Sequence, residues 1–204
     1  MVRNLSQPIS QGYAGERYTP AFGLTLIAPP SDEPVSVVEA KRHSRISIDD
    51  DDSLIEGQLM AARLHVENLT GLQLCTATWK WSGTYFPCVL PRPPLQSILA
   101  VKYVAADGTL TTFTGTNYQA DILCRPARIE PAYGQAWPTQ RSQDTASVFV
   151  EYVAGFGAPE DVPANIKHAI LLLFGWMYEN REPAKSELMA VNALLSPESV
   201  LELV

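Results

Sequence analysis

The most informative segment of the chain covers residues 162–178 and reads VPANIKHAILLLFGWMY. Pro163 is tolerated in the first turn of a helix, and the apolar residues after it recur at helical spacing. They cover most of the circumference of the predicted helix instead of one stripe. Such a helix is either central to a large core or shared with a neighbouring chain, and the small number of other predicted helices favours the second arrangement. We therefore predict subunit contacts at Ile166, Ile170, Leu173 and Met177.

Two helices are predicted in the first third of the chain. Ser36 and Glu39 have the spacing of a capping box, which begins a short helix that ends near His43. Four consecutive aspartates at residues 49–52 favour the start of a longer helix, because one of them can cap it and the others complement its dipole. Gly71 follows where a left-handed residue would end that helix. The complete set of predicted helices lies near residues 36–43, 53–70, 163–181 and 188–195.

Between residues 72 and 155 the apolar pattern changes from helical spacing to alternation. The residues from Cys75 to Trp81 alternate between apolar and polar, as in a half-buried strand, and Asp107 with Gly108 signals a hairpin. Further strands are predicted at residues 86–90, 97–104, 110–113, 118–123 and 147–153.

These patterns predict an α+β fold in which a mainly antiparallel β lobe is inserted into a helical core. The predicted core comprises residues 35–71 and 156–195, and the lobe comprises residues 72–155. Residues 1–34 contain glycines and prolines without an apolar period, so we expect an extended N-terminal arm that orders on binding a partner. Residues 196–204 form a C-terminal tail.

Composition and charge narrow the class of protein. The chain has 204 residues, of which 46% are hydrophobic, and 15 basic against 22 acidic residues give a net charge of −7. This balance argues against a protein that grips nucleic acid phosphates. We expect neither export nor membrane insertion, because the first residues lack a signal peptide and the longest apolar run is about half of the ~20 residues that a span needs. Cys75, Cys88 and Cys124 are expected to be reduced thiols.

The sequence lacks the motifs of catalytic, metal and cofactor sites, so we expect no enzymatic activity, no metal and no cofactor. The consecutive aspartates at residues 49–52 do not converge on a cation as the alternate ligands of a calcium loop do. None of the three histidines, His43, His65 and His168, has zinc spacing with another histidine or with a cysteine.

Several segments occur together in the order and spacing of one known family. They are residues 34–41 (PVSVVEAK), 67–71 (ENLTG), 90–97 (LPRPPLQS), 150–157 (VEYVAGFG), 162–173 with 178–182, and 193–197 (ALLSP). Across residues 34–197 the chain resembles the tailed-phage head–tail connector (adaptor) family, including its relatives in prophages and gene transfer agents. It departs from the family pattern in two places: Glu198 and Ser199 replace an aromatic and a basic residue, and the arm before Pro34 is longer than usual.

The resemblance implies a non-enzymatic ring, expected to be a dodecamer, in the neck of a virion or phage-like particle assembled in the bacterial host cytoplasm. Its implied partners are the portal protein, a neck stopper or tail-terminator protein, and double-stranded DNA that passes through the lumen without specific binding. The C-terminal segment tends to bind the portal in these families, and its counterparts here are Leu194, Leu195, Pro197, Leu201 and Val204. Arg181 and Glu182 either bridge subunits or only end their helix.

Two other classes of function remain open on the residues alone. A monomeric binding module of a tail or receptor-binding assembly would use the β lobe and would form no ring. A hydrolase would use the aspartates at residues 49–52 with His43 or His65, and would lose its activity when the aspartates were changed to asparagine. For the adaptor, acidic helical segments that line the lumen would repel DNA phosphates and let the DNA pass.

Overall fold

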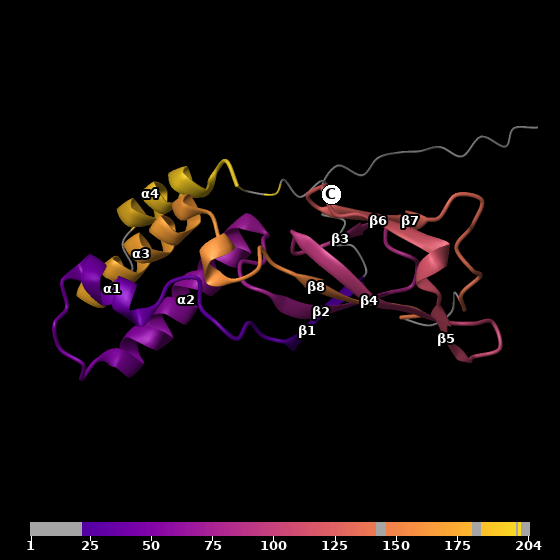
Figure 1. Cartoon of the computed structure of the whole chain (residues 1–204), viewed down its shortest axis with the longest axis horizontal. Helices are drawn as coiled ribbons and strands as arrows, with labels where there is room; N and C mark the ends of the chain where they lie inside the picture. The colour runs from indigo at the N-terminus through magenta and orange to yellow at the C-terminus, as the bar shows by residue number, and fades with distance from the viewer. Residues whose placement is uncertain (1–21, 142–145, 181–184, 199, 201–204) are drawn as a thin grey trace, which may run out of the picture.

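The computed structural model describes residues 22–141, 146–180, 185–198 and 200 of the chain. The molecule is elongated, with a helical body at one end and a β lobe at the other (Figure 1). The helices of the body are α1 (Val37–Ser44), α2 (Asp52–Thr70), α3 (Ala164–Glu179) and α4 (Lys185–Leu195). Most strands of the lobe fall between α2 and α3 along the chain. The predicted α+β fold class is confirmed.

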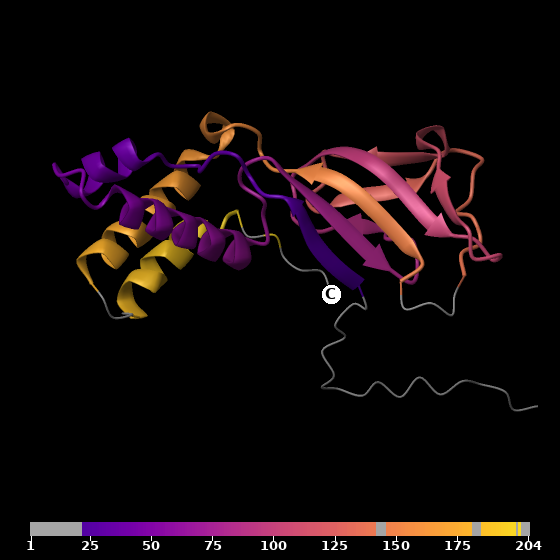
Figure 2. The same cartoon turned by 90° about the horizontal axis from the view of Figure 1, so that it is seen from below.

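Helix α3 lies at the centre of the helical body. It packs against α1, α2 and α4 of the same chain, and Figure 2 shows α2 crossing α3 with α1 and α4 on opposite sides of it. The side chains of Ile166, Ile170 and Leu173 are at most 4% exposed. The prediction that these three residues contact a neighbouring subunit is therefore wrong, because the chain's own short helices cover them. Met177 is partly buried and packs against the same core.

The predicted ends of the first two helices are present. At the start of α1, the Ser36 N–H donates to the Glu39 carboxylate (2.8 Å) and the Glu39 N–H donates to the Ser36 hydroxyl (3.2 Å). These bonds complete the capping box, and the Ser36 N–H and hydroxyl that donate to the Glu39 carboxylate hold the pKa of Glu39 below its ordinary value. At the end of α2, Gly71 adopts the left-handed conformation (φ 73°) and its N–H bonds to the Glu67 carbonyl.

Two antiparallel sheets form the β lobe. The first has the strand order β1 (Phe22–Ala28), β2 (Ala77–Gly83), β8 (Val148–Ala154), β4 (Leu95–Val104) and β5 (Leu110–Phe113). The second has the order β3 (Val89–Leu90), β7 (Ala127–Pro131) and β6 (Tyr118–Asp121). Short 3₁₀ turns lie at Gly115–Asn117 (η1) and Pro159–Asp161 (η2). Both sheets contribute to a second hydrophobic core that includes Trp81, Val101, Ile129 and Val150.

Strand β1 lies inside the predicted N-terminal arm. It pairs with β2, from Phe22 opposite Gly83 to Ala28 opposite Thr78. The expectation that the arm orders only on binding a partner is therefore wrong for residues 22–28, whereas residues 1–21 lie outside the described residues. The sequence FGLTLIA shows no alternation, because nearly every side chain of this edge strand is exposed. Strand β7 was also not predicted, since the prolines at positions 126 and 131 flank it and disfavour a strand.

We expect the α3 core to dominate the stability of the helical body. Phe174 is fully buried in that core. Its replacement in a Phe174→Ala variant should lower the free energy of unfolding by about 3–5 kcal/mol, through lost transfer energy and a cavity. Leu54 on α2 is 52% exposed, so Leu54→Ala should change it by less than about 0.5 kcal/mol. Urea denaturation followed by circular dichroism measures both, and equal effects would contradict the central position of α3.

Candidate functional site

The side chains of the aspartates at residues 49–52 connect α2 to other helices. Asp51 is the N-cap of α2, but its side chain makes no bond to the helix backbone. Instead, the Lys41 ammonium group on α1 bridges Asp49 (2.5 Å) and Asp52 (2.7 Å). The Tyr178 hydroxyl on α3 donates to Asp51 (2.8 Å). The aspartate run therefore ties the start of α2 to both α1 and α3, and the predicted side-chain cap is corrected.

The side chains considered for catalysis or metal binding do not form a centre. His43 and His168 meet edge to face at exposed positions, with ring centroids 6.2 Å apart, and His65 is exposed on α2. Burial raises the pKa of the Cys75 thiol to about 11, so this thiol stays protonated at neutral pH. Within the described ranges, no three His, Cys, Asp or Glu residues gather as metal ligands. None of the helices described is long and apolar enough to cross a bilayer.

The residues predicted to dock on the portal lie in different environments. Leu195 is 1% exposed and Leu194 is partly buried, and both pack in the α3 core. Pro197 is exposed just after α4. The other predicted contacts, Leu201, Val204, Arg181 and Glu182, lie outside the described residues. Leu195 therefore stabilises the helical body and presents no docking surface.

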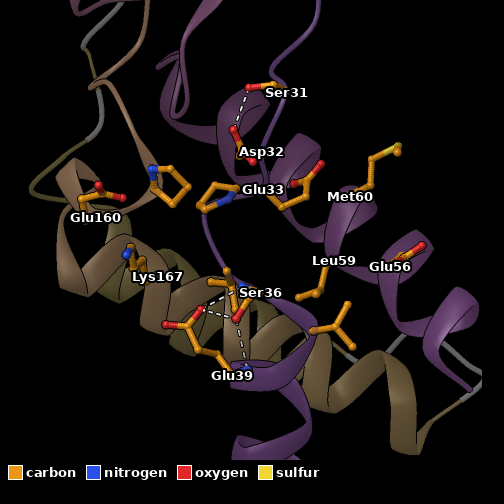
Figure 3. A pocket seen from close by; sticks show the side chains of 14 residues that line it. Ser31, Asp32, Glu33, Ser36, Glu39, Glu56, Leu59, Met60, Glu160 and Lys167 are labelled. Carbon is orange, nitrogen blue, oxygen red and sulfur yellow. Dashed lines mark hydrogen bonds between the residues drawn. The ribbon is translucent and has the colours of Figure 1, made fainter. Parts of the chain in front are cut away.

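A groove of about 610 Å³ opens where the two parts of the molecule join (Figure 3). Its lining comes from the segment that connects β1 to α1, from one face of α2, from η2 and from the first turns of α3. In Figure 3, Glu160 and Lys167 stand on one wall and Met60 and Glu56 stand on the other. Apolar atoms of Val35, Leu59, Met60 and Pro159 also line the groove.

The groove is acidic. Its charged lining residues are Asp32, Glu33, Glu39, Glu56, Glu160 and Lys167. Three of these carboxylates are engaged: Asp32 accepts from the Ser31 hydroxyl (2.7 Å), Glu33 pairs with Arg63 (2.7 Å), and Glu39 completes the capping box. Glu56 and Glu160 make no hydrogen bond or ion pair with any residue that the structure describes. The groove therefore presents free carboxylates beside apolar surface, a combination that suits a segment that is both basic and apolar.

A buried polar cluster lies next to the groove and joins α2 to the β lobe. The Glu67 carboxylate accepts hydrogen bonds from Arg63 (2.9 Å), from the Gln73 amide (2.9 Å) and from the Leu74 N–H (3.1 Å). The Gln73 carbonyl oxygen accepts in turn from the Trp79 indole N–H on β2 (2.9 Å). Each buried polar group in this hydrogen-bond network therefore has a partner, as buried polar groups in folded proteins generally do.

Arg92, in the loop before β4, also joins α2 to the β lobe. One of its guanidinium nitrogens donates to the Glu67 carbonyl (2.9 Å) and another donates to the Asn68 side chain (2.8 Å). The guanidinium also lies over the Trp79 ring, 5.6 Å from its centroid. Burial raises the pKa of Glu67, and the nearby Arg63 and the Leu74 N–H oppose that shift. The cluster fixes how the β lobe meets the helical body, and so it fixes the walls of the groove.

Comparison with known proteins bears on the fold. No protein-family model and no curated protein matches the sequence. Chains in three solved structures match over 89% of this chain and 97% of theirs. These structures are the neck of an empty gene transfer agent (GTA) particle computed with C6 symmetry (TM-score 0.73, 21% identity), the virion of the native GTA particle (0.74, 20%) and the neck of the native GTA particle computed with C12 symmetry (0.72, 21%).

The chain has the fold of these GTA chains. The resemblance stated from residues 34–197 is confirmed as a likeness of fold, which is what identities of 20–21% show. Neither the groove nor the buried cluster beside it was predicted from the sequence. One signal was available, because Arg63 and Glu67 are four residues apart on the same helical face as the apolar Leu59 and Val66. A charged pair on a buried stripe indicates a structural ion pair.

We expect the Arg63–Glu67 pair to be necessary for stability. Arg63→Met leaves the Glu67 carboxylate buried without its cation, so the free energy of unfolding should fall by about 3–5 kcal/mol near neutral pH. Arg63→Met with Glu67→Gln should recover most of this loss, because Gln73 and the Leu74 N–H keep an uncharged partner. Urea denaturation of the two variants checks the difference. Equal destabilisation of both would show that the loss does not come from an unpaired charge.

The same single variant should have a characteristic pH dependence. In the folded state the pKa of Glu67 is raised, and removal of Arg63 raises it further. A carboxyl group of this kind binds its proton more tightly when folded, so stability is retained at low pH and lost as pH rises through the folded pKa. The deficit of Arg63→Met relative to the native chain should therefore shrink between neutral pH and about pH 5. A deficit that grows on acidification would contradict this assignment.

Proposed function

We propose that this chain is a non-enzymatic head–tail connector (adaptor), which forms a ring between the portal vertex and the tail of a phage-like particle. The observation that carries the proposal is the shared fold over 89% of this chain with chains of the GTA neck and virion structures. Those neck structures were computed with C6 and C12 symmetry, which supports a ring of this chain as well. The proposed partners are the portal protein, a stopper or tail-terminator protein, and further copies of the chain.

The charge of the chain supports a channel through which DNA slides. Its net charge is −7, and the exposed Asp49 and Asp50 lie in the turn between α1 and α2. A lumen lined by such carboxylates would repel phosphates, so DNA would pass without adhering to the wall. The proposed ring therefore extends the channel of the portal and needs no nucleic acid binding site.

The portal-docking segment is proposed to begin after α4. Leu195 packs in the core, and Val200 donates its N–H to the Thr70 carbonyl (3.0 Å) at the end of α2. A truncation that removes α4 would therefore damage the helical body together with any docking segment. A chain that ends at Val200 removes only Leu201 to Val204 and keeps every described core contact. This truncation separates docking from folding.

We expect the full chain to co-purify with rings of the portal protein from the same particle and to add a second ring beneath them. Mass photometry and negative-stain class averages measure the added ring. The chain that ends at Val200 should fold with the same melting temperature and should bind the portal weakly or not at all. Binding by both chains would leave the connector function in place and would put docking elsewhere. Failure of the full chain to bind the portal would contradict the proposed function.

A further inference from the structure

Helix α2 turns charged side chains inward and apolar side chains outward. Arg63 and Glu67 are buried against the rest of the chain, whereas Leu54, Met60 and Leu64 are 45–52% exposed. A surface helix normally shows the reverse arrangement, with its polar residues on the face away from the core. The core of the helical body is already complete within one chain. The outward apolar face of α2 is therefore a contact surface for another molecule.

This outward face of α2 carries almost no charge. The structure describes every residue of α2, and among the exposed ones only Glu56 and His65 have an ionisable side chain. Glu56 belongs to the groove, whose lining it forms together with Glu160. The face that points away from α3 is thus uncharged and apolar, on a helix that keeps its ion pair on the inside.

Gly57 lies on the outward face and has no packing role within its own chain. A Cβ atom at this position would meet no atom of the chain within 4 Å, although glycine destabilises a helix interior relative to alanine. Ala61 is four residues further on, on the same side of the helix, and the larger Leu54 and Leu64 lie before and after the two. Small residues between large ones leave room for a side chain of a second helix to approach the α2 backbone.

A second uncharged face lies on the other side of the helical body, on α4. In Figure 1, α3 lies between α4 above it and α2 below it, and α3 packs against both. Met189 on α4 is 72% exposed. The other exposed side chains that the structure describes on α4 and directly after it are also uncharged: Asn192, Ala193, Ser196 and Pro197. Both outer layers of the body therefore present uncharged surfaces, in a chain of which 18% of the residues are charged.

These two faces suit a contact between copies of the chain. Each copy has a net charge of −7, so two copies approach each other with least repulsion where both surfaces are uncharged. A ring also needs two different complementary surfaces on each subunit, because its interface is heterologous. The faces of α2 and α4 meet both requirements, and the protruding Met189 side chain matches the small residues of α2.

We propose that α4 of one copy packs against the outward face of α2 of the next copy, with Met189 seated over Gly57 and Ala61. This inference rests on the proposed function, since it assigns the contact that closes the ring. It also replaces the predicted subunit contacts at residues of α3 that the fold buries. The occupant of the α2 face is therefore a second copy of this chain.

A larger residue at position 57 tests this contact without disturbing the fold. Gly57→Leu should not lower the melting temperature of the unassembled chain, because the position is open in its own chain and leucine favours a helix. It should raise the concentration needed for ring assembly on the portal by about tenfold or more, because the added side chain blocks Met189. Mass photometry measures the assembly. The matched control is Glu56→Leu, one position away on the same helix but in the groove, which should assemble like the native chain.

Disulfide trapping identifies the partner of the α2 face. Ala61→Cys with Met189→Cys places one thiol on each face, in a chain with Cys88 and Cys124 changed to serine and its remaining thiol buried. Oxidation of the assembled protein should give a ladder of covalent dimers, trimers and larger species on a non-reducing gel. Each new cysteine alone should give no ladder, and neither should Glu56→Cys combined with Met189→Cys.

The outcomes separate this contact from the proposed function. A ring on the portal that gives no ladder, or a Gly57→Leu chain that assembles normally, would overturn the α2–α4 contact and leave the connector function standing. Dimers formed by Ala61→Cys alone would place two α2 faces together, and cross-links to the portal would make the portal the occupant, so either result contradicts the contact. If the native chain forms no oligomer with or without portal rings, both the proposed function and this contact are wrong.

Discussion

The burial of one ion pair on α2 determines how the two parts of this molecule fit together. The Glu67 carboxylate is held by Arg63, Gln73 and the Leu74 N–H, and the carbonyl of the same residue accepts from Arg92. These partners come from the helix itself, from the chain that leaves it and from the loop before β4. A buried charge is expensive unless its partners stay in place. The cluster therefore holds the helical body and the β lobe in one relative orientation. It also holds the walls of the neighbouring groove in place.

A second constraint is the amount of apolar surface on α3. One helix that is apolar on most sides needs partners on most sides, and here α1, α2 and α4 of the same chain supply them. The helical body is thus complete within one chain, and the surfaces left for other chains lie elsewhere. The core of the helical body therefore does not depend on neighbouring chains.

The elements that could be predicted from the sequence are those with a clear hydrophobic period or a local capping motif. The capping box at Ser36 and Glu39, the left-handed Gly71 and the change from helical spacing to alternation are local, and the structure confirms the elements that they predict. The edge strand β1 escaped prediction because its exposed side chains show no alternation. Asp51 is the N-cap of α2, as predicted for one of the aspartates at residues 49–52, but the bonds that their side chains make were not predicted. Their partners, Lys41 and Tyr178, are on other helices, and no local pattern reveals a partner so far along the chain.

Short-range spacing was enough to predict the α+β class and the positions of most helices and strands, and the order of several segments across residues 34–197 carried the resemblance to head–tail connectors. They were not enough to establish which apolar residues face the chain's own core. The same periodicity is compatible with a partner helix from within or from outside the chain, so Ile166, Ile170 and Leu173 could be assigned only once the packing of α3 was known. The folded chain also brings Glu56 and Glu160, which are far apart in sequence, together into one groove. Which distant residues lie close together depends on how the helices and strands pack. The hydrophobic period of a single element does not determine that packing.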